Sequence, residues 1–466
     1  MSCAHTLRAR NVAPALKSAI AQGLLGTRHG KATLFDCGPP AAQFFDLGAF
    51  RKKIQSLRDA FPDGKNKCTK PLSANGVLHT LAVKANPFST ILGEAHQMGL
   101  GAESASIVEV WQALRQGIPA QNIIYDSPAK AAAEIRHALS IGLLLNLDNM
   151  SELRKTREAL ESLRNENIIK SQPRIGLRIN PQMGPGTIAA TSTATKTSKF
   201  GFATREGDVD PIELYLQNRW LNAIHVHTGS QGCPLELSAQ GVAEALRMAI
   251  EVNKRAGTQQ IQHFDMGGGV PADYDSDADS REFQEYRDLI DTHASGLWEQ
   301  GFRVYTEMGR SLTAKMGWTA TRVEAVKESG GRRIAIGHVG ADLFVRTAYQ
   351  PQNWPHRISV FTHDGEPKDV AEEELLPQDV AGPLCFSGDM VAVARPLPRI
   401  EEGDIVVVHD TGAYTYSMYS RYNSRLAPAA YGYLNAGEEK INFQTVKAAE
   451  TVDQVLQFWE SPSASR

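Results

Sequence analysis

Short apolar runs alternate with longer amphipathic stretches from about Leu81 to Leu312, and this alternation constrains the fold more than any other feature of the sequence. The apolar runs have the length and composition of strands, and the stretches between them have the spacing of helices. Repeated strand–helix units imply parallel strands joined by right-handed crossovers. The expected strands are Leu78–Val83, Asn122–Tyr125, Leu143–Asn146, Arg174–Asn180, Ala223–His227, Gln262–Met266 and Arg303–Glu307, and the expected helices are Ser89–Met98, Ser106–Gln116, Ala129–Ile141, Asn149–Arg164 and Ala239–Ala256.

Seven or eight such units within about 230 residues suit a (β/α)8 barrel, an α/β fold, with a doubly wound sheet as the alternative. Periodicity does not decide between the two, because it does not show whether a sheet closes on itself. The stretch Thr187–Thr197 is rich in Thr, Ala and Ser and has no apolar period, which predicts a loop. A lid that closes over a ligand is the functional version of the same expectation.

Beyond Leu312 the sequence pattern changes to short runs of β-branched residues separated by Gly, Pro and Asp. This pattern predicts a mostly antiparallel β domain. We therefore expect a barrel domain at residues 45–312 and a C-terminal β domain at residues 313–466. Residues 1–44 are expected to contribute to the β domain, in part through a strand at Gly30–Pro40. The expected strands of the β domain are Thr319–Val326, Arg333–His338, Met390–Ala394 and Asp404–His409.

The composition is that of a globular protein of two domains, with 466 residues, 42% hydrophobic and 22% charged. Lys and Arg total 49 against 52 Asp and Glu, a net charge of -3, so nothing indicates a nucleic-acid surface. No apolar run approaches the roughly 20 residues that span a bilayer. The five cysteines lack C-x-x-C spacing and are expected to be free thiols in a reducing compartment. Since the first 24 residues have no continuous apolar core, we expect a cytoplasmic protein, with an organellar transit peptide as the alternative.

Clusters of polar residues follow several of the expected strands. In a (β/α)8 barrel the active site lies at this carboxyl end of the strands. Lys84 leaves an apolar strand within Ala82–Pro87. Desolvation there would lower its pKa and favour imine chemistry, although a lysine at a barrel rim also reaches solvent without any such role. His225 and His227 lie on the same face of another strand, which suits stacking or acid–base work better than a metal, since no further ligand stands at metal-ligand spacing.

Three glycines follow a strand within Asp265–Pro271, where backbone N–H groups approach an anion such as phosphate, or where the chain makes a plain tight turn. Glu307 and Arg310, at another strand end, are placed to serve two ends of an anionic heterocycle or to pair with each other. In the β domain, Gly382–Asp389 holds a cysteine and Asp410–Tyr414 ends in a tyrosine. Inert packing and a turn anchor are the plain alternatives for these two residues.

The order and spacing of these six clusters resemble the diaminopimelate and ornithine decarboxylase family, pyridoxal-phosphate enzymes with an alanine-racemase-like fold. The similarity runs from about Leu78 to Pro428, most of the chain. It implies a (β/α)8 barrel with a C-terminal β domain, pyridoxal 5′-phosphate as cofactor, decarboxylation of an amino acid at Cα, and a homodimer with shared active sites. An amino-acid racemase, and a non-catalytic regulator that has lost the cofactor, are the alternatives from other classes.

The resemblance also implies roles for individual residues. Lys84 would hold the cofactor as a Schiff base, and His227 would stack on its pyridine ring. Glu307 would pair with the pyridine nitrogen, keep it protonated and so let the ring accept the electrons left by carbon dioxide. Cys385 would enter the partner subunit's site as the acid that protonates Cα. The residues expected to hold the phosphate or touch the cofactor nearby are Ser230, Gly268, Gly269, Arg310 and Tyr414.

Two departures from the family fall among the residues expected to bind substrate, which are Arg346, Tyr349, Phe386 and Tyr414. Phe386 follows the cysteine where the family has an acid that contacts the distal amino group of the substrate. Arg346 stands one residue nearer Tyr349 than in the family, which on a strand would turn its side chain to the other face. Diaminopimelate is therefore the first substrate hypothesis, and another D- or L-diamino acid or a modified amino acid is the alternative.

Overall fold

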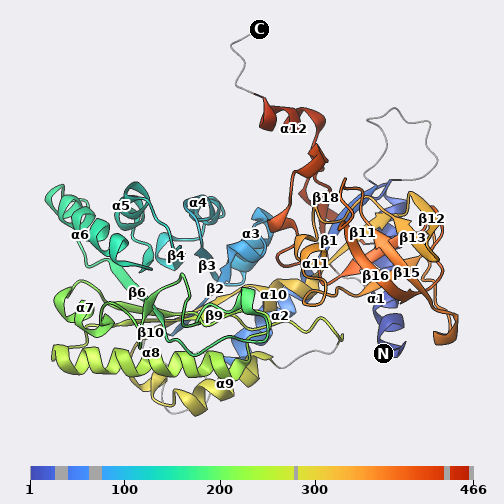
Figure 1. Cartoon of the computed structure of the whole chain (residues 1–466). Coiled ribbons are helices and arrows are strands. Elements are labelled where there is room, and N and C mark those ends of the chain that lie inside the picture. Colours follow the sequence, from blue (N-terminus) through green and yellow to red (C-terminus); the bar gives the residue numbers. More distant parts are fainter. Residues whose placement is uncertain (1, 27–39, 62–75, 278–281, 435–440, 461–466) are drawn as a thin grey trace, which may run out of the picture. The chain divides into compact units, whose positions relative to one another are not determined.

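The computed structural model describes residues 2–26, 40–61, 76–277, 282–434 and 441–460. Contacts within the chain divide it into two compact units (Figure 1). The barrel unit comprises Arg51–Ala272 and Ser280–Leu312, and the β unit comprises Met1–Phe50, Asp273–Asp279 and Thr313–Arg466.

The barrel unit is built on eight parallel strands that close into a ring. Their order is β5-β4-β3-β2-β10-β9-β8-β6, and pairing of β5 with β6 closes it. The barrel is therefore confirmed, and the doubly wound sheet is wrong. The strands are β2 (Val77–Ala82), β3 (Gly101–Ser104), β4 (Ile123–Asp126), β5 (Leu144–Leu147), β6 (Arg174–Asn180), β8 (Ala223–Val226), β9 (His263–Gly268) and β10 (Arg303–Met308), with the short β7 (Phe202–Ala203) beside β6.

One barrel strand, β3, is absent from the strands expected from the sequence. Its four residues are Gly101–Ser104, and none of them is β-branched or aromatic. The strand forms because its neighbours β2 and β4 pair with it on both sides and bury it completely. Tertiary context thus overrides a weak local preference.

Helices surround the strands of the barrel unit (Figure 1), and local signals set several of their ends. The side chains of Ser106 and Asn149 cap α4 and α6 by accepting hydrogen bonds from the backbone N–H groups of Glu109 and Glu152. Gly142 ends α5 in the left-handed conformation that glycine adopts at low cost. The helices are α2 (Leu47–Ala60), α3 (Ser89–Gln97), α4 (Ile107–Arg115), α5 (Ala132–Ile141), α6 (Met150–Asn165), α7 (Pro211–Gln217), α8 (Leu235–Ala256), α9 (Glu282–His293) and α10 (Arg310–Thr313).

The β unit holds a six-stranded and a four-stranded sheet, both mostly antiparallel. The order of the larger sheet is β14-β17-β11-β1-β18-β19, with β14 (Ile358–Phe361), β17 (Ile405–His409), β11 (Gly317–Arg322), β1 (Ala41–Asp46), β18 (Ala429–Tyr433) and β19 (Phe443–Lys447). The order of the smaller sheet is β12-β13-β15-β16, with β12 (Ala325–Ser329), β13 (Arg332–Ile336), β15 (Leu376–Ala381) and β16 (Met390–Leu397). The helices of this unit are α1 (Ser2–Ala21), α11 (Val345–Tyr349) and α12 (Val452–Trp459).

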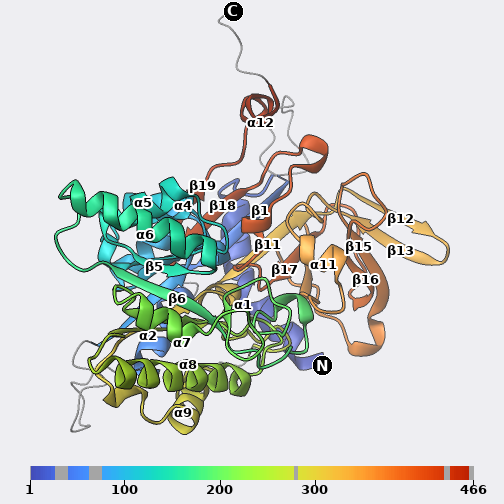
Figure 2. The ribbon, with the colours of Figure 1, turned by 60° about the vertical axis from the view of Figure 1, so that its left-hand side comes forward.

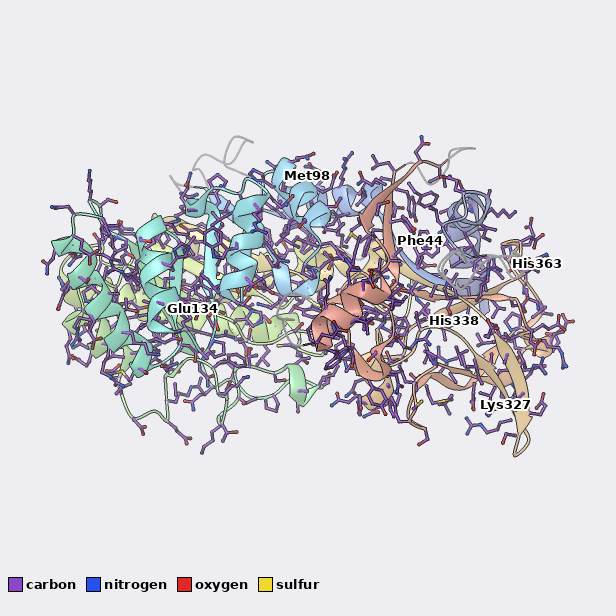
Figure 3. The ribbon with its side chains drawn as sticks, turned by 90° about the horizontal axis from the view of Figure 1, so that it is seen from above. Phe44, Met98, Glu134, Lys327, His338 and His363 are labelled. Carbon is purple, nitrogen blue, oxygen red and sulfur yellow. The ribbon has the colours of Figure 1, made fainter. Side chains whose placement is uncertain are left out.

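Long-range pairing brings the N-terminal part of the chain into the larger sheet. β1 lies between β11 and β18, and its Phe44 stacks on Trp318 with ring centroids 4.2 Å apart (Figure 3). β12 and β13 form a hairpin that extends from the smaller sheet (Figure 2), so the single expected strand Thr319–Val326 is in fact split between β11 and β12. The strand expected at 30–40 lies outside the described residues except for Pro40.

The stretch Thr187–Thr197 has one short 3₁₀ turn, Ala189–Thr191, and is otherwise irregular, as expected for a loop. It is tied to the loop after β8, because Ala194 N–H donates to Thr228 O and the Thr193 hydroxyl donates to His227 O. Within the part of the chain that the structure describes, no helix combines the length and apolarity needed to cross a bilayer.

Candidate active site

Polar side chains from the barrel strands gather at the carboxyl ends of those strands. Lys84 lies in the 3₁₀ turn Val83–Ala85 directly after β2, and Glu307 lies near the end of β10. Between them along the ring come residues from the remaining strands, most of them shielded from solvent. They are Glu103 of β3, Asp126 of β4, Asn146 of β5, Arg178 of β6, His225 of β8 and Asp265 of β9.

Lys84 is paired with Glu103, a residue that the sequence did not single out. The Lys84 Nζ lies 2.6 Å from both carboxylate oxygens of Glu103, which is completely buried, whereas the Lys84 side chain is 36% exposed. Burial outweighs the lysine and raises the pKa of Glu103 to about 8. The segment Gly101–Ser104 has no strand pattern in its sequence. The only sequence signal for Glu103 is therefore that an acidic residue stands one position before the end of this segment.

His227 lies one residue beyond β8 and is held by a backbone donor. The Gly268 N–H donates to the His227 Nδ1 at 3.1 Å. Burial and the nearby Arg178 lower the pKa of His227 to about 3, so the ring is neutral. Since Nδ1 accepts, the ring proton lies on Nε2.

The three glycines at the end of β9, Gly267–Gly269, have backbone conformations and close contacts that disfavour any other residue. Gly267 and Gly269 have positive φ values of 65° and 94°. A Cβ on Gly268 would lie 1.8 Å from the Glu307 carbonyl oxygen, and one on Gly269 would lie 2.0 Å from the Gly229 carbonyl oxygen. The segment therefore packs directly against β10 and against the loop that follows β8.

The two remaining expected cofactor residues of the barrel unit also come together. The Arg310 Nε donates to the Ser230 hydroxyl at 3.5 Å, and the Arg310 side chain is buried. A buried guanidinium beside a hydroxyl is a suitable site for a phosphate.

Glu307 is nearly inaccessible and is held ionised. Burial opposes its charge, but the nearby His225 and Lys84 outweigh burial and hold the pKa of Glu307 well below its usual range. Its Oε2 lies 3.5 Å from the His225 Nε2, while its Oε1 has no hydrogen-bond partner among the described residues. A buried carboxylate oxygen that lacks a donor fits a protonated pyridine nitrogen.

Asp126, His225 and Glu307 place one ligand atom each within 4.8 Å of the others, a spacing that a metal ion also uses. A cation already occupies this cluster, because the Arg178 guanidinium donates to the Asp126 Oδ2 at 2.7 Å. The geometry therefore suits an ion-pair network better than a metal centre.

The expected substrate residues all belong to the β unit. Arg346 and Tyr349 lie on α11, a short helix, so the strand on which Arg346 would turn to the other face is wrong. On a helix one residue changes the direction of a side chain by about 100° instead. The Arg346 guanidinium lies between the rings of Trp354 and Tyr414, 4.8 Å and 4.7 Å from their centroids.

Cys385 is an exposed free thiol beside an exposed group of aromatic rings. Phe386 stacks on Tyr349 with centroids 6.0 Å apart and meets Tyr422 edge-on at 6.2 Å. Tyr349 and Tyr422 are 71% and 48% exposed. The segment Gly382–Asp389 thus presents an aromatic ring and a thiol, with no acid exposed.

Residues 49–314 match the model of the pyridoxal binding domain of the pyridoxal-dependent decarboxylases, more than half of the chain. The chain belongs to this family. It is a pyridoxal-phosphate-dependent amino-acid decarboxylase of the diaminopimelate decarboxylase type. The diaminopimelate decarboxylase of Helicobacter pylori strain J99 is 30% identical over 390 residues, covering 82% of this chain and 87% of the relative. That of Zymomonas mobilis is 31% identical over 365 residues, covering 77% of this chain and 81% of the relative.

Solved structures of the family have the same fold. The Helicobacter pylori diaminopimelate decarboxylase complexed with L-lysine matches this decarboxylase with a TM-score of 0.75 at 26% identity, over 90% of this chain and 96% of the other. The lysine/ornithine decarboxylase of Vibrio vulnificus complexed with cadaverine matches with a TM-score of 0.66 at 20% identity, over 91% and 96% of the two chains, which shows a common fold.

Proposed function

We propose that the carboxyl end of this barrel binds pyridoxal phosphate and removes the α-carboxylate of an amino acid of the diaminopimelate class. The observation that carries the proposal is the buried Glu307 Oε1, which lacks a donor at the ring of strands that also presents Lys84. When bound, the cofactor supplies an electron sink for the electrons released with carbon dioxide. The protein supplies its position and its charge environment.

Each barrel residue then has a definite task. Lys84 would hold the cofactor through its Nζ, and Glu103, which accepts from that Nζ, would hold or return its proton. Glu307 would orient the pyridine nitrogen and keep it protonated. His227, fixed by Gly268, would hold the ring and exclude water from it.

The phosphate is assigned to the other end of the site. Ser230 and Arg310 supply a hydroxyl and a buried guanidinium, and Gly269 allows the chain to approach. The Gly268 N–H already donates to His227, so Gly268 contributes close packing more than a hydrogen bond. Tyr414 is assigned, through its hydroxyl, to the phosphate bound by a second copy of the chain.

We assign Cys385 to the active site of a second copy of the chain, as the donor of the proton that replaces the carboxylate. The exposed rings around Cys385 support a homodimer, because large exposed aromatic groups are typical of interfaces. A protein with Lys84→Ala mixed with one with Cys385→Ala should recover part of the activity after subunit exchange. No recovery would refute the shared site. A free catalytic thiol also fits the cytoplasm, where thiols stay reduced.

For the substrate, the relatives favour meso-diaminopimelate. A second candidate is an amino acid whose side-chain end carries no free ammonium. Phe386 favours this candidate, because it stands where the family has an acid. The acidic residue of the segment Gly382–Asp389 is Asp389, which is buried and accepts hydrogen bonds from the Ala341 and Leu384 backbone N–H groups. It is therefore not available to a distal ammonium, which would be costly to bury unpaired.

Carbon dioxide release by the cofactor-loaded protein tests both candidates. The panel holds meso-diaminopimelate, both enantiomers of lysine, ornithine and arginine, and amino acids with acylated or apolar side-chain ends, with Lys84→Ala protein as the control. Turnover of diaminopimelate alone supports the first candidate, and turnover of an acylated or apolar member with diaminopimelate inert supports the second. A protein that does not bind the cofactor would refute the proposed function.

A further inference from the structure

Of the two histidines in the site, His227 is held by Gly268 and is expected to contact the cofactor. His225 has had no role so far. It projects from β8 into the barrel and is completely buried. Its Nε2 faces the Glu307 Oε2 at 3.5 Å, and its Nδ1 faces the Asp126 Oδ1 at 3.7 Å. Neither ring nitrogen has a hydrogen bond to any other group in the described residues, so nothing competes for the ring.

The two carboxylates that face this ring are also close to each other. Asp126 of β4 is held by Arg178, whose guanidinium donates to Oδ2 at 2.7 Å, and Glu307 lies on β10. Ligand atoms of Asp126, His225 and Glu307 all lie within 4.8 Å of one another. A neutral imidazole would leave two buried anions close together beside it, whereas an imidazolium attracts both.

We propose that His225 is a positioning residue, a buried imidazolium between Asp126 and Glu307 that keeps the proton on the pyridine side of the contact between Glu307 and the cofactor. The proposal rests on the role of Glu307 given above. The imidazolium lies 3.5 Å from the Glu307 Oε2 and stabilises the ionised carboxylate, which therefore competes less for the proton of a pyridine nitrogen.

The other charged groups around the His225 ring favour its positive form. Burial disfavours a positive His225, but three carboxylates outweigh it and raise the pKa of His225 to about 9. In order of decreasing effect they belong to Glu307, Asp126 and Asp265. Burial and the negative Glu307 raise the pKa of Asp265 well above its usual value. Its oxygens accept from the Gly267 N–H and the Asn146 amide, each at 3.0 Å.

The remaining neighbours on the adjoining strands are cationic or already paired. Arg178 of β6 is neutralised by Asp126, and Lys84 after β2 is paired with Glu103 of β3. His227 is on the same strand segment but is neutral, because its Nδ1 accepts a backbone hydrogen bond. Two histidines separated by one residue therefore have opposite charge states, and only His225 has two carboxylates facing its ring.

The test uses full-length protein loaded with pyridoxal phosphate labelled with ¹⁵N in the ring, whose resonance distinguishes protonated from neutral pyridine. His225→Gln removes the charge, Asp126→Asn weakens it, and His263→Gln is the matched control. His263 is a histidine at the start of β9 whose ring contacts the Tyr305 hydroxyl at 3.0 Å, away from these carboxylates.

We expect the ¹⁵N resonance of the ring nitrogen at pH 7 to move toward that of neutral pyridine in His225→Gln, because loss of the imidazolium raises the pKa of Glu307 and lets its carboxylate compete for the shared proton. Asp126→Asn should shift it in the same direction by less, and His263→Gln should not shift it. The kcat of His225→Gln should fall about tenfold or more, while KM changes by less than about threefold, because the substrate does not touch His225. A purely structural role would not move the ring-nitrogen resonance.

An unchanged ring-nitrogen resonance in His225→Gln would overturn the proposal, and if that variant does not fold, an unchanged resonance in Asp126→Asn would do so. Labelling the histidines with ¹⁵N gives an independent measurement: the His225 resonance should report a charged ring at pH 7, and a neutral ring would overturn the proposal. If the wild type failed to bind the cofactor, the proposed function would be refuted, and the charge of His225 would still be decided by its own resonance.

Discussion

Replacing Gly268 with alanine tests whether the close contact between β9 and β10 is what places Glu307. The added Cβ would lie 1.8 Å from the Glu307 carbonyl oxygen and 2.7 Å from its carbonyl carbon. Cβ atoms essentially never approach other heavy atoms within 3.0 Å, so the two strands must separate by more than an ångström at this point. Gly268 pairs directly with Glu307 in the β9–β10 register, so the movement falls on the residue assigned to the cofactor.

The expected cost follows from that movement. Overpacking a rigid interior costs about 1–3 kcal/mol, and a ladder hydrogen bond stretched by an ångström loses about 1 kcal/mol. We therefore expect Gly268→Ala to lower the free energy of unfolding by about 2–4 kcal/mol and the Tm of a chain of this length by roughly 2–4 °C. Misplacing a site residue by about 1 Å costs on the order of 100-fold in rate, so kcat should fall by about that factor.

Thermal unfolding measures the change in stability, carbon dioxide release by the cofactor-loaded protein measures kcat, and a cofactor titration measures cofactor affinity. Gly296→Ala is the matched control, because Gly296 has a φ of -90° and an added Cβ would meet nothing nearer than 3.7 Å. The control should unfold within about 0.5 kcal/mol of the wild type. If Gly268→Ala matched Gly296→Ala in Tm, cofactor affinity and kcat, the strand contact would not be what requires glycine.

Three further outcomes are expected. Lys84→Ala should abolish carbon dioxide release and the Schiff-base absorbance of the cofactor while the protein stays folded by circular dichroism; wild-type turnover would remove Lys84 from the mechanism. Phe386→Glu should raise kcat/KM for meso-diaminopimelate by about tenfold or more, since it supplies a partner for the distal ammonium; no gain in a steady-state assay would mean that this position does not face the substrate. Burial outweighs Arg178 and raises the pKa of Asp148 to about 6 from 3.8, so the folded state binds this proton more tightly than the unfolded state. The associated stability, roughly 3 kcal/mol, is present below pH 3.8 and lost as the pH rises through 6. Asp148→Asn should therefore be more stable than the wild type in urea at pH 7 but not at pH 4, and equal stability at pH 7 would contradict the shift.

The alternation of apolar runs and helical patterns predicted every barrel strand except β3, with end errors of at most two residues and with none at β6. It did so because strand and helix periods are local properties of a sequence. The same reading located Lys84, His227 and Glu307 near strand ends, since polar residues after buried strands stand out against apolar runs.

Only the tertiary structure decided the pairing of β5 with β6, which closes the ring, and the pairing of β3 with β2 and β4, which makes Gly101–Ser104 a strand that carries Glu103. It also decided that Arg346 lies on a helix. Closure and register depend on contacts between segments far apart in the chain, and no local period records them. The Asp126–His225–Glu307 network comes from three strands of the ring, and its charge state exists only because the fold buries those three side chains against one another.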